Sequence, residues 1–466
     1  MGSKFNYSQS ELVGALALPT GDPLVEESKR VGGKSFVVHL GEKASMQEMV
    51  QELWSLPRDI VSDGYDAALE ALSGQIPMNI HAYPTGTECF TWVIPEKWTC
   101  HEAYLENLNG ERLFSYKDNP LHIVSYSLPF KGEVAREELF NHLHVHPRLP
   151  EAVPFVFKYY ERDWGLCCSQ MMKDSLKDDY YRVMINTDFS YGTLKVGEVV
   201  VPGESDDCFV LCAHLCHPAM VNDDLSGVVV GLKVMQELMA RKGLRYTYRF
   251  LILPETIGSA AYLSQNQDLI TTMRGGLFLE MLGSSHPHAL QLSLAGNTQV
   301  DKCVQLVVKE HDPASWTGDF LTVILNDERM FNAPGIGVPM LSLSRVLPPG
   351  NKDYPYREYH SNLDTPENIN YQNMKDSCEL VLKIIDAWEA NRIPQPKFKG
   401  EPFFSRFRGI DYATMRKDLH QIMFRLDGHQ SVADIAWNTG INFSRAKYIL
   451  DVFEQEKLIH YVADNG

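Results

Sequence analysis

Residues 208–227 read CFVLCAHLCHPAMVNDDLSG, and they predict a strand, a polar loop and the start of a helix. The run from Phe209 to Ala213 is almost wholly apolar, which is typical of a strand covered on both faces of a parallel sheet. Ser226 and Gly227 are expected to end the loop, because apolar residues recur at helical spacing from Val228 to Leu238.

The predicted loop is dense in residue types that bind metals. Two imidazoles and two carboxylates follow the strand within eleven residues, namely His214, His217, Asp223 and Asp224. In open α/β sheets, ligands bind just beyond the carboxyl ends of the strands, and this loop lies there. Imidazole and carboxylate together suit zinc or a similar divalent ion. A hydrogen-bonded loop histidine is the ordinary explanation for one such residue, but the whole set favours a metal site.

Composition bounds the classes of function. The 466 residues are 44% hydrophobic, which allows a large core and two or three domains, and the net charge of -17 disfavours generic binding to nucleic acid or anionic membranes. No run approaches the roughly 20 apolar residues of a membrane span, and the first residues lack the apolar core of a signal peptide. Nine cysteines without paired Cys-x-x-Cys motifs predict neither a disulfide framework nor a zinc finger, and we expect a cytoplasmic protein.

The order of patterns along the chain predicts its domains. Strands alternate with helices between about residues 181 and 390, which predicts an α/β fold with a three-layer arrangement around a mixed, mostly parallel sheet. A helix is expected from Ser45 to Leu72, split by Pro57 and opened by a capping box of Ser45 and Glu48. The predicted domains are an N-terminal extension (1–43), a catalytic domain (44–79 and 173–393), a β-rich insert (80–172) and a C-terminal domain (400–466).

The insert has strand and hairpin signals but no clear catalytic cluster. Asn109-Gly110 between two aromatic and β-branched runs predicts a hairpin. His142, His144 and His146 would share one face of a strand. Hydrogen-bonded histidines are favoured over a separate three-histidine metal site, because no acid stands nearby in that run. The aromatic residues of the insert are expected either to cover the catalytic pocket or to contact a neighbouring chain.

The C-terminal domain resembles a winged helix-turn-helix. A capped helix from Ser431 to Gly440 precedes a longer helix that begins near Asn442, and an apolar strand follows. Only Arg445 and Lys447 supply positive charge near the start of that longer helix. Because phosphate neutralisation drives affinity for nucleic acid, a protein contact or a homo-oligomer interface is favoured over DNA binding.

Three further polar side chains could also serve as metal ligands. Glu255 and Glu280 each end an apolar run, and His360 lies in a polar loop four residues before Asp364. Each alone could be a helix-terminal acid, a salt-bridged acid or a loop histidine. A carboxylate in a mostly apolar strand rarely stands there without a charge partner, so their joint occurrence favours one shared site.

The order of these motifs resembles the co-catalytic zinc aminopeptidases of the bacterial leucyl aminopeptidase and glutamate carboxypeptidase type. The resemblance covers about residues 180–390, and the whole layout is similar to a bacterial aminopeptidase-like group with a β-rich insert and a C-terminal winged helix. It implies metal-ligand roles for four residues, with the second bridging two ions: His214, Asp223, Glu280 and His360.

Two departures from that family bear on the site. Cys216 stands where the first motif of the family, His-x-Asp, has its aspartate, so His217 is a candidate substitute ligand or supporting group. The family also has two adjacent glutamates, a general base and a ligand, where Pro254-Glu255 offers one. One or two zinc ions, or other divalent metals, are therefore expected, with Asp224 as a spare carboxylate.

The resemblance implies hydrolysis of an amide bond in a small peptide or modified amino acid by a metal-activated water, with Glu255 either as the base or as a metal ligand, the base then being lost or supplied elsewhere. Asp327 lies in a loop that resembles the family's substrate loop. Arg329 and Arg345 could meet a substrate carboxylate or form structural ion pairs, and Asp364 is expected to support His360. The alternatives are deacylation of a sugar or secondary metabolite, and a non-catalytic scaffold that assembles through the winged helix.

Overall fold

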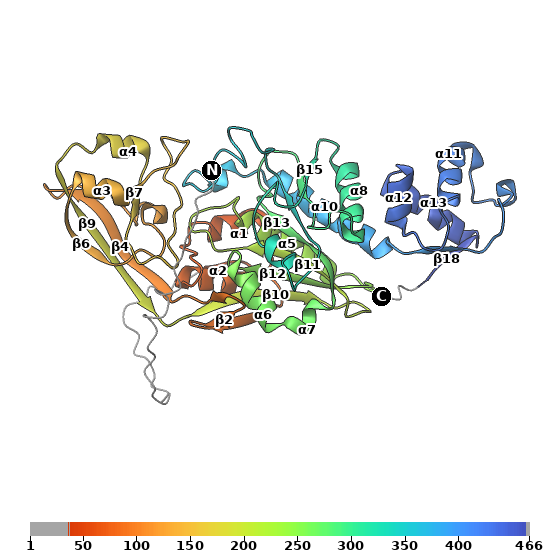
Figure 1. The fold of residues 1–466 in the computed structure, drawn as a ribbon, viewed down its shortest axis with the longest axis horizontal. Helices are drawn as coiled ribbons and strands as arrows, with labels where there is room; N and C mark the ends of the chain where they lie inside the picture. The colour runs from red at the N-terminus through yellow and green to blue at the C-terminus, as the bar shows by residue number, and fades with distance from the viewer. Residues whose placement is uncertain (1–35, 37, 463–466) are drawn as a thin grey trace, which may run out of the picture. The chain divides into compact units, whose positions relative to one another are not determined.

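The computed structural model describes residue 36 and residues 38–462, so most of the predicted N-terminal extension lies outside the described residues. Its centre is an eight-stranded sheet of order β1-β10-β12-β11-β13-β16-β14-β15 (Figure 1). The strands are β1 (Asn79–Pro84), β10 (Thr193–Val201), β11 (Cys208–His214), β12 (Thr247–Leu253), β13 (Met273–Glu280), β14 (Ala289–Gln291), β15 (Trp316–Gly318) and β16 (Met340–Ser344). The predicted mixed, mostly parallel α/β sheet is thus confirmed.

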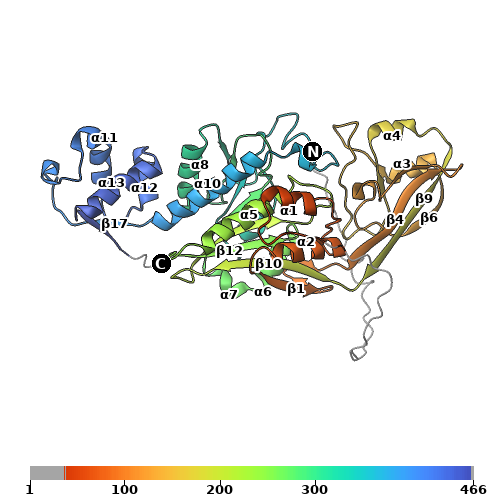
Figure 2. The ribbon, with the colours of Figure 1, turned by 180° about the vertical axis from the view of Figure 1, so that it is seen from behind.

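Helices cover both faces of this sheet. The helices α1 (Met46–Leu53), α5 (Leu225–Met239) and α10 (Tyr371–Ala390) pack together on one face, as Figure 2 shows. The other helices of this part are α2 (Asp63–Ser73), α6 (Ile257–Gln265), α7 (Gln267–Ile270), α8 (Gln299–His311), α9 (Glu328–Phe331) and the 3-10 turn η2 (Pro366–Asn368). Helix α1 starts with the predicted capping box, and Pro57 lies between α1 and α2 as expected.

The central strands run parallel, and this places their carboxyl ends at one edge of the sheet. Strand β11 pairs in parallel with β12 on one side and with β13 on the other, and β13 pairs in parallel with β16. Antiparallel pairs flank this centre, since β10 runs antiparallel to β12 and β14 to β16. All seven residues of β11 are buried, as expected for a strand covered on both faces.

The helix after β11 begins earlier than its sequence predicts. Helix α5 starts at Leu225 rather than at Val228, because the Asp224 side chain caps it by accepting the Gly227 N–H at 3.0 Å. A Cβ atom on Gly227 would lie 2.2 Å from the Leu279 carbonyl oxygen. Glycine is therefore required here by the close approach of α5 to β13, and it does not end the loop.

The region of the predicted insert contains a four-stranded antiparallel sheet of order β5-β4-β9-β6. The helices and strands of this region are β2 (Glu88–Cys89), β3 (Trp92–Val93), β4 (Lys97–Asn107), β5 (Arg112–Ser115), η1 (Pro120–His122), β6 (Phe130–Ala135), α3 (Arg136–His142), β7 (Leu143–His144), β8 (Leu166–Cys167), α4 (Gln170–Ser175) and β9 (Tyr180–Ser190). The Asn109-Gly110 hairpin is confirmed, with Gly110 at a φ of 85°. Strand β1 and helix α4 cross the two predicted boundaries of the insert, and β9, which lies in the predicted catalytic domain, pairs with β4 and β6. The division into domains stays a prediction.

The three alternating histidines of this region do not share a strand face. His142 ends α3, His144 lies in β7 and His146 follows in a loop. The His142 ring contacts the Trp164 carbonyl oxygen at 3.0 Å, and His146 Nδ1 accepts the Leu149 N–H at 2.9 Å. Within residues 38–462 these three side chains form no metal-binding group.

The C-terminal part consists of three helices and a two-stranded sheet. The elements are β17 (Pro394–Pro396), η3 (Phe404–Arg406), α11 (Tyr412–Met423), α12 (Val432–Thr439), α13 (Phe443–Gln455) and β18 (Ile459–Tyr461), which pairs with β17. Ser431 and Asp434 form a capping box on α12, and Gly440 ends this helix in the left-handed region. The winged-helix assignment stays a prediction. No helix in the part of the chain that the structure describes is long and apolar enough to cross a membrane.

Candidate metal centre

Three neighbouring strands bring polar side chains to the same edge of the central sheet. Strand β11 ends at His214, β13 ends at Glu280, and Glu255 follows two residues after β12. In the register of the parallel pair β11 and β12, His214 lies beside Leu253. Parallel strands end at the same edge, so these three groups, which are distant in sequence, become neighbours.

Asp223 lies at the centre of this group. Its Oδ1 atom is 3.2 Å from His214 Nε2 and 3.3 Å from His217 Nδ1. Its Oδ2 atom is 2.9 Å from His360 Nε2. The two oxygens of one carboxylate therefore face different histidines.

The two glutamates lie beside different histidines of the cluster. Glu280 Oε1 is 3.5 Å from His214 Nε2, and Glu255 Oε2 is 3.3 Å from His217 Nε2. Two groups of potential ligands result, each with atoms within 4.8 Å of one another: His214, Asp223 and Glu280, and His217, Asp223 and His360. Because both contain Asp223, the arrangement fits two divalent ions that share this carboxylate.

Several atoms of the cluster are buried without a hydrogen-bond partner. They are both ring nitrogens of His214, Nδ1 of His217, Oδ2 of Asp223 and Oε2 of Glu280. Buried polar atoms are normally hydrogen-bonded, and these lie near one another without hydrogen-bond geometry. Ligands around a tetrahedral zinc, at about 2.0–2.1 Å from the metal, are separated by roughly 3.4 Å. The separations between His214, His217 and Asp223 match that spacing, so the residues fit a divalent cation.

Charge is concentrated in this buried cluster. Burial alone would raise the pKa of Asp223, but the charge of His217 and the close imidazoles of His214 and His360 hold that pKa well below its usual range. Burial alone would lower the pKa of His217, but the nearby Asp223 and Glu255 raise it to about 10. Burial raises the pKa of Glu280 to about 7 despite its contact with His214. A divalent cation would take the place of the protons that balance this charge.

Asp224 supports the ligands and is itself directed away from them. Its carboxylate accepts the N–H groups of Gly227 at 3.0 Å and Met281 at 2.9 Å. It also accepts the His214 N–H at 3.4 Å. One side chain thus fixes the end of β11, the start of α5 and the end of β13.

Asp364 also has a supporting role, but with different partners from those that the sequence predicts. Its carboxylate accepts the backbone N–H of Asn222 at 2.8 Å, the N–H of Asp223 at 3.1 Å and the Tyr356 hydroxyl at 2.8 Å. The predicted contact of Asp364 with the His360 ring is wrong, because Asp364 has these other partners. The carboxylate holds the backbone of the loop that carries Asp223.

The three predicted substrate contacts have different surroundings. Arg345 is 5% exposed, forms an ion pair with Asp376 and donates to Ser377 Oγ at 3.0 Å. Of the two roles predicted for Arg345, the structural ion pair is the one observed. Asp327 is buried and accepts the Thr256 N–H at 2.9 Å near the start of α6, and its role as a substrate contact stays a prediction. Arg329 is exposed, and its Nη2 lies 3.3 Å from Thr256 Oγ1, beside Glu255. Arg329 therefore remains a candidate for substrate binding.

Two residues of the site escape the sequence analysis. Arg58 is completely buried and donates to the carbonyl oxygens of Leu215 at 2.9 Å and Met220 at 2.8 Å, so it holds the loop that follows β11. Asn326 donates to Glu280 Oε1. An arginine beside Pro57, in a segment of buried apolar residues, is the signal that could have pointed to Arg58.

Aromatic side chains close over the histidines. Phe155 meets the His217 ring edge-on at 5.0 Å and the His360 ring at 5.6 Å between centroids. The Phe155 N–H also donates to the His360 carbonyl oxygen at 2.8 Å. Tyr359 stacks on His360 at 3.9 Å. A residue of the predicted insert therefore forms part of the site.

Comparisons with known proteins agree with this geometry. The family described as a domain of unknown function, DUF4910, matches residues 47–391. A Clostridium acetobutylicum protein named "Putative polysaccharide biosynthesis protein with aminopeptidase-like domain" is 30% identical over 449 residues, which cover 94% of this chain and 98% of the relative.

Solved structures extend the comparison. The crystal structure of a "putative peptidase" from Clostridium acetobutylicum is 31% identical with a TM-score of 0.80, covering 90% of this chain and 96% of that one. The zinc aminopeptidase BSAP from Bacillus subtilis is 12% identical with a TM-score of 0.53, covering 74% of this chain and 95% of that one, which is a likeness of fold. The chain therefore belongs to the DUF4910 family, and it has the fold of the zinc aminopeptidases.

Proposed function

We propose that this chain is a metal-dependent hydrolase that cleaves an amide bond in a small peptide or modified amino acid. The observation that carries the proposal is the position of Asp223, whose two oxygens face separate histidines at 2.9–3.3 Å. A carboxylate between two sets of nitrogen and oxygen ligands is the arrangement that a two-metal hydrolase requires. The family assignment and the names of the relatives support this reading.

The chain offers a complete ligand set on each side of Asp223. His214 and Glu280 would hold one ion, and His217 and His360 would hold the other. His217 would supply the ligand that the lone Glu255 cannot supply if Glu255 acts as a base. Zinc is the first choice because imidazole and carboxylate are its common ligands. When bound, zinc lowers the pKa of a coordinated water toward about 7 and polarises a carbonyl group.

Glu255 has the properties of the general base. Its side chain is 29% exposed, whereas those of Asp223 and Glu280 are 2% and 1% exposed. Burial would raise its pKa, but the contact with His217 lowers it, so the carboxylate is ionised and can accept a proton. It would take the proton of the attacking water and return it to the leaving amine.

The aromatic residues beside the histidines would orient the substrate. Phe157 is 47% exposed and stacks on Tyr159 at 4.5 Å, next to Phe155. Such faces bind an apolar side chain or the flat face of a sugar ring. Arg329, exposed beside Thr256, would meet a carboxylate of the substrate.

A second candidate is hydrolysis of an amide on a sugar. The observation that favours it is the name of the Clostridium acetobutylicum relative, which refers to polysaccharide biosynthesis. The same base and ligands would serve both reactions, so the two candidates differ only in what binds against Phe157 and Tyr159.

For the C-terminal part we propose a protein contact instead of nucleic-acid binding. The two bases near the start of α13 are already neutralised, since Arg445 Nε lies 3.0 Å from Asp418 and Lys447 Nζ lies 2.6 Å from Asp451. Ser444 also donates to Glu310 of α8. Few charges remain on this helix to displace counterions from a phosphate backbone.

The test is a hydrolysis assay of zinc-loaded protein against a panel of aminoacyl anilides, dipeptides and N-acetylated amino sugars. We expect turnover of at least one class, its loss on chelation and its recovery when zinc is added. His360→Ala should reduce both the zinc content and the rate, while the exposed His429→Ala serves as the matched control. Absence of turnover across the panel with zinc bound would contradict a hydrolytic role toward these classes.

A further inference from the structure

We infer that the Cys216 sulfur is a direct ligand of the ion that His214 holds, which makes the centre a mixed nitrogen, oxygen and thiolate site. The inference rests on the proposed metal-dependent function and goes beyond it. It concerns the residue that stands where related enzymes of this fold have an aspartate in the His-x-Asp motif.

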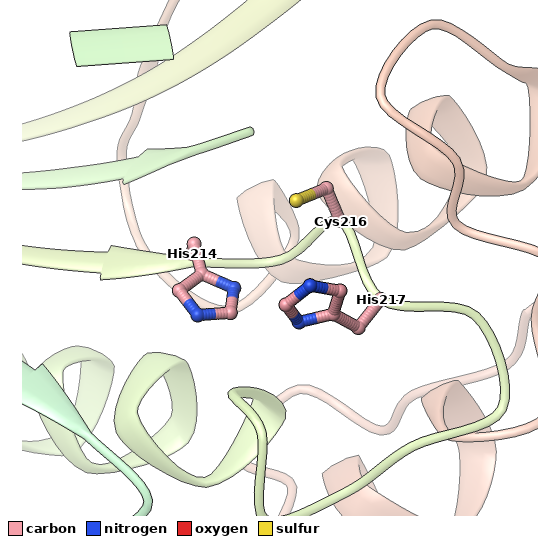
Figure 3. A group of neighbouring side chains, drawn as sticks. All are labelled: His214, Cys216 and His217. Atoms are coloured by element: carbon pink, nitrogen blue, oxygen red, sulfur yellow. The ribbon is translucent and has the colours of Figure 1, made fainter. Parts of the chain in front are cut away.

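The geometry places the sulfur among the nitrogen ligands. Ligand atoms of His214, Cys216 and His217 all lie within 4.8 Å of one another, and the three residues are 0%, 1% and 2% exposed. Figure 3 shows His214 at the end of β11 and Cys216 and His217 on the loop that follows, and the two imidazole rings meet at right angles with centroids 4.6 Å apart. The three donors therefore lie together where β11 ends, beside the other candidate ligands.

A second observation is independent of the cysteine. Both ring nitrogens of His214 and Nδ1 of His217 are buried without a hydrogen-bond partner. Buried nitrogens of this kind, beside a thiol, indicate that each ring lacks a partner that a bound ion would supply. Asp223 Oδ1, 3.2 Å from His214 Nε2, supplies a further donor to the ion that His214 holds.

The surroundings of Cys216 are those of a metal-bound thiolate. The Glu255 N–H donates to Sγ at 3.1 Å, a contact that would orient the sulfur and disperse its negative charge. Arg58, which donates to the Leu215 carbonyl oxygen at 2.9 Å, fixes the backbone directly before it. When zinc binds, the thiol proton leaves to solvent and the zinc–sulfur bond forms, so no group is oxidised or reduced.

The consequence is a change in metal preference. Thiolate is a soft ligand that favours zinc, whereas a carboxylate at the same place would also suit manganese or magnesium. We therefore expect Cys216→Asp to weaken zinc binding by at least about tenfold relative to manganese binding. Other buried cysteines, such as Cys303 in α8, belong to none of the metal-binding groups found among the described residues.

The test is X-ray absorption at the zinc edge on the full chain loaded with zinc, which reports the ligands whether or not a substrate is turned over. We expect one sulfur scatterer at about 2.3 Å together with nitrogen and oxygen at about 2.0–2.1 Å. The sulfur shell should disappear in Cys216→Ala and remain in the matched control Cys303→Ala. If Cys216→Ala does not fold, the wild-type and Cys303→Ala spectra still decide whether a sulfur is bound.

The outcomes separate this inference from the proposed function. Bound zinc with only nitrogen and oxygen neighbours would overturn the role of Cys216 and leave the metal-dependent hydrolase standing. A sulfur shell without turnover of any substrate would support the ligand and count against hydrolysis. Failure of the wild-type chain to take up zinc would overturn both.

Discussion

Two buried clusters of acids and histidines lie on the same central sheet, and they differ in how their charges are satisfied. In the first, Glu198 of β10 has Oε2 at 2.9 Å from His81 Nε2 and Oε1 at 2.6 Å from both Arg249 Nη1 and the Tyr262 hydroxyl. In the second, around Asp223, buried nitrogens and oxygens lie close together without hydrogen bonds.

The difference separates a structural cluster from a candidate functional one. Both are buried and both combine carboxylate with imidazole, so residue type alone does not distinguish them. Every oxygen of Glu198 has a protein partner, and among the buried polar side-chain atoms of this cluster only Arg249 Nε lacks one. The Asp223 cluster is incomplete as protein alone, and this is the physical reason to assign it a metal.

The largest expected effect concerns Glu255. Glu255→Gln should lower kcat by about 10²–10⁴, because it removes the proton acceptor and leaves the metal ligands in place. Zinc content, measured by elemental analysis, should stay at the wild-type value, and the exposed Glu204→Gln should change neither quantity. If zinc is lost along with activity, Glu255 is a ligand and the base lies elsewhere.

The next effect should come from the satisfied cluster. Glu198→Gln should lower the free energy of unfolding by about 3–5 kcal/mol, because it leaves Arg249 buried without its charge partner. Denaturant unfolding measures this change. The zinc content should not change, and a loss of zinc in this variant would mean that the two clusters are not independent.

Metal removal should have a smaller effect on stability. With zinc at 100 times its dissociation constant, binding contributes about 2.7 kcal/mol, which for a chain of this size is a shift of about 3 °C in Tm. Thermal unfolding with and without chelator should show this difference in wild type and in Glu198→Gln. In Asp223→Asn the difference should vanish, and its persistence there would place the metal outside the cluster.

The smallest effect is a dependence on pH. Burial alone would raise the pKa of Glu198, but hydrogen bonds from His81, Tyr262 and Arg249 lower it to about 2, below the ordinary value of 4.5. This group therefore contributes stability that is complete above pH 4.5 and is lost as the pH falls toward about 2. Glu198→Gln should flatten the acid limb of the stability curve over that interval, and an unchanged limb would rule out this assignment.

Much of the fold follows from local patterns in the sequence. Three such features depend only on residues that are close together in the sequence, so local patterns predict them. They are the apolar run of β11, the capping box on α1 and the Asn109-Gly110 hairpin. The start of α5 does not follow in the same way. There the Asp224 side chain caps the helix while it also accepts the Met281 N–H just after β13, and that contact with β13 is not visible in a local pattern.

The candidate site shows the same limit. The sequence places His214, Asp223, Glu280 and His360 at strand ends and in loops, and the structure brings them together as the resemblance implies. The sequence could not show that Arg345 faces Asp376, that Asp364 holds the Asp223 loop, or that Phe155 contacts the histidines. Each of these contacts joins residues from separate parts of the chain, and only the packed structure specifies them. The cytoplasmic location and the oligomeric state stay predictions.

The most direct test of the central claim is anomalous diffraction at the zinc edge from crystals of zinc-loaded protein. We expect two anomalous peaks beside Asp223, with His214 and Glu280 at one peak and His217 and His360 at the other. A single peak would reduce the centre to one ion. Fully loaded crystals without a peak at Asp223 would contradict the account.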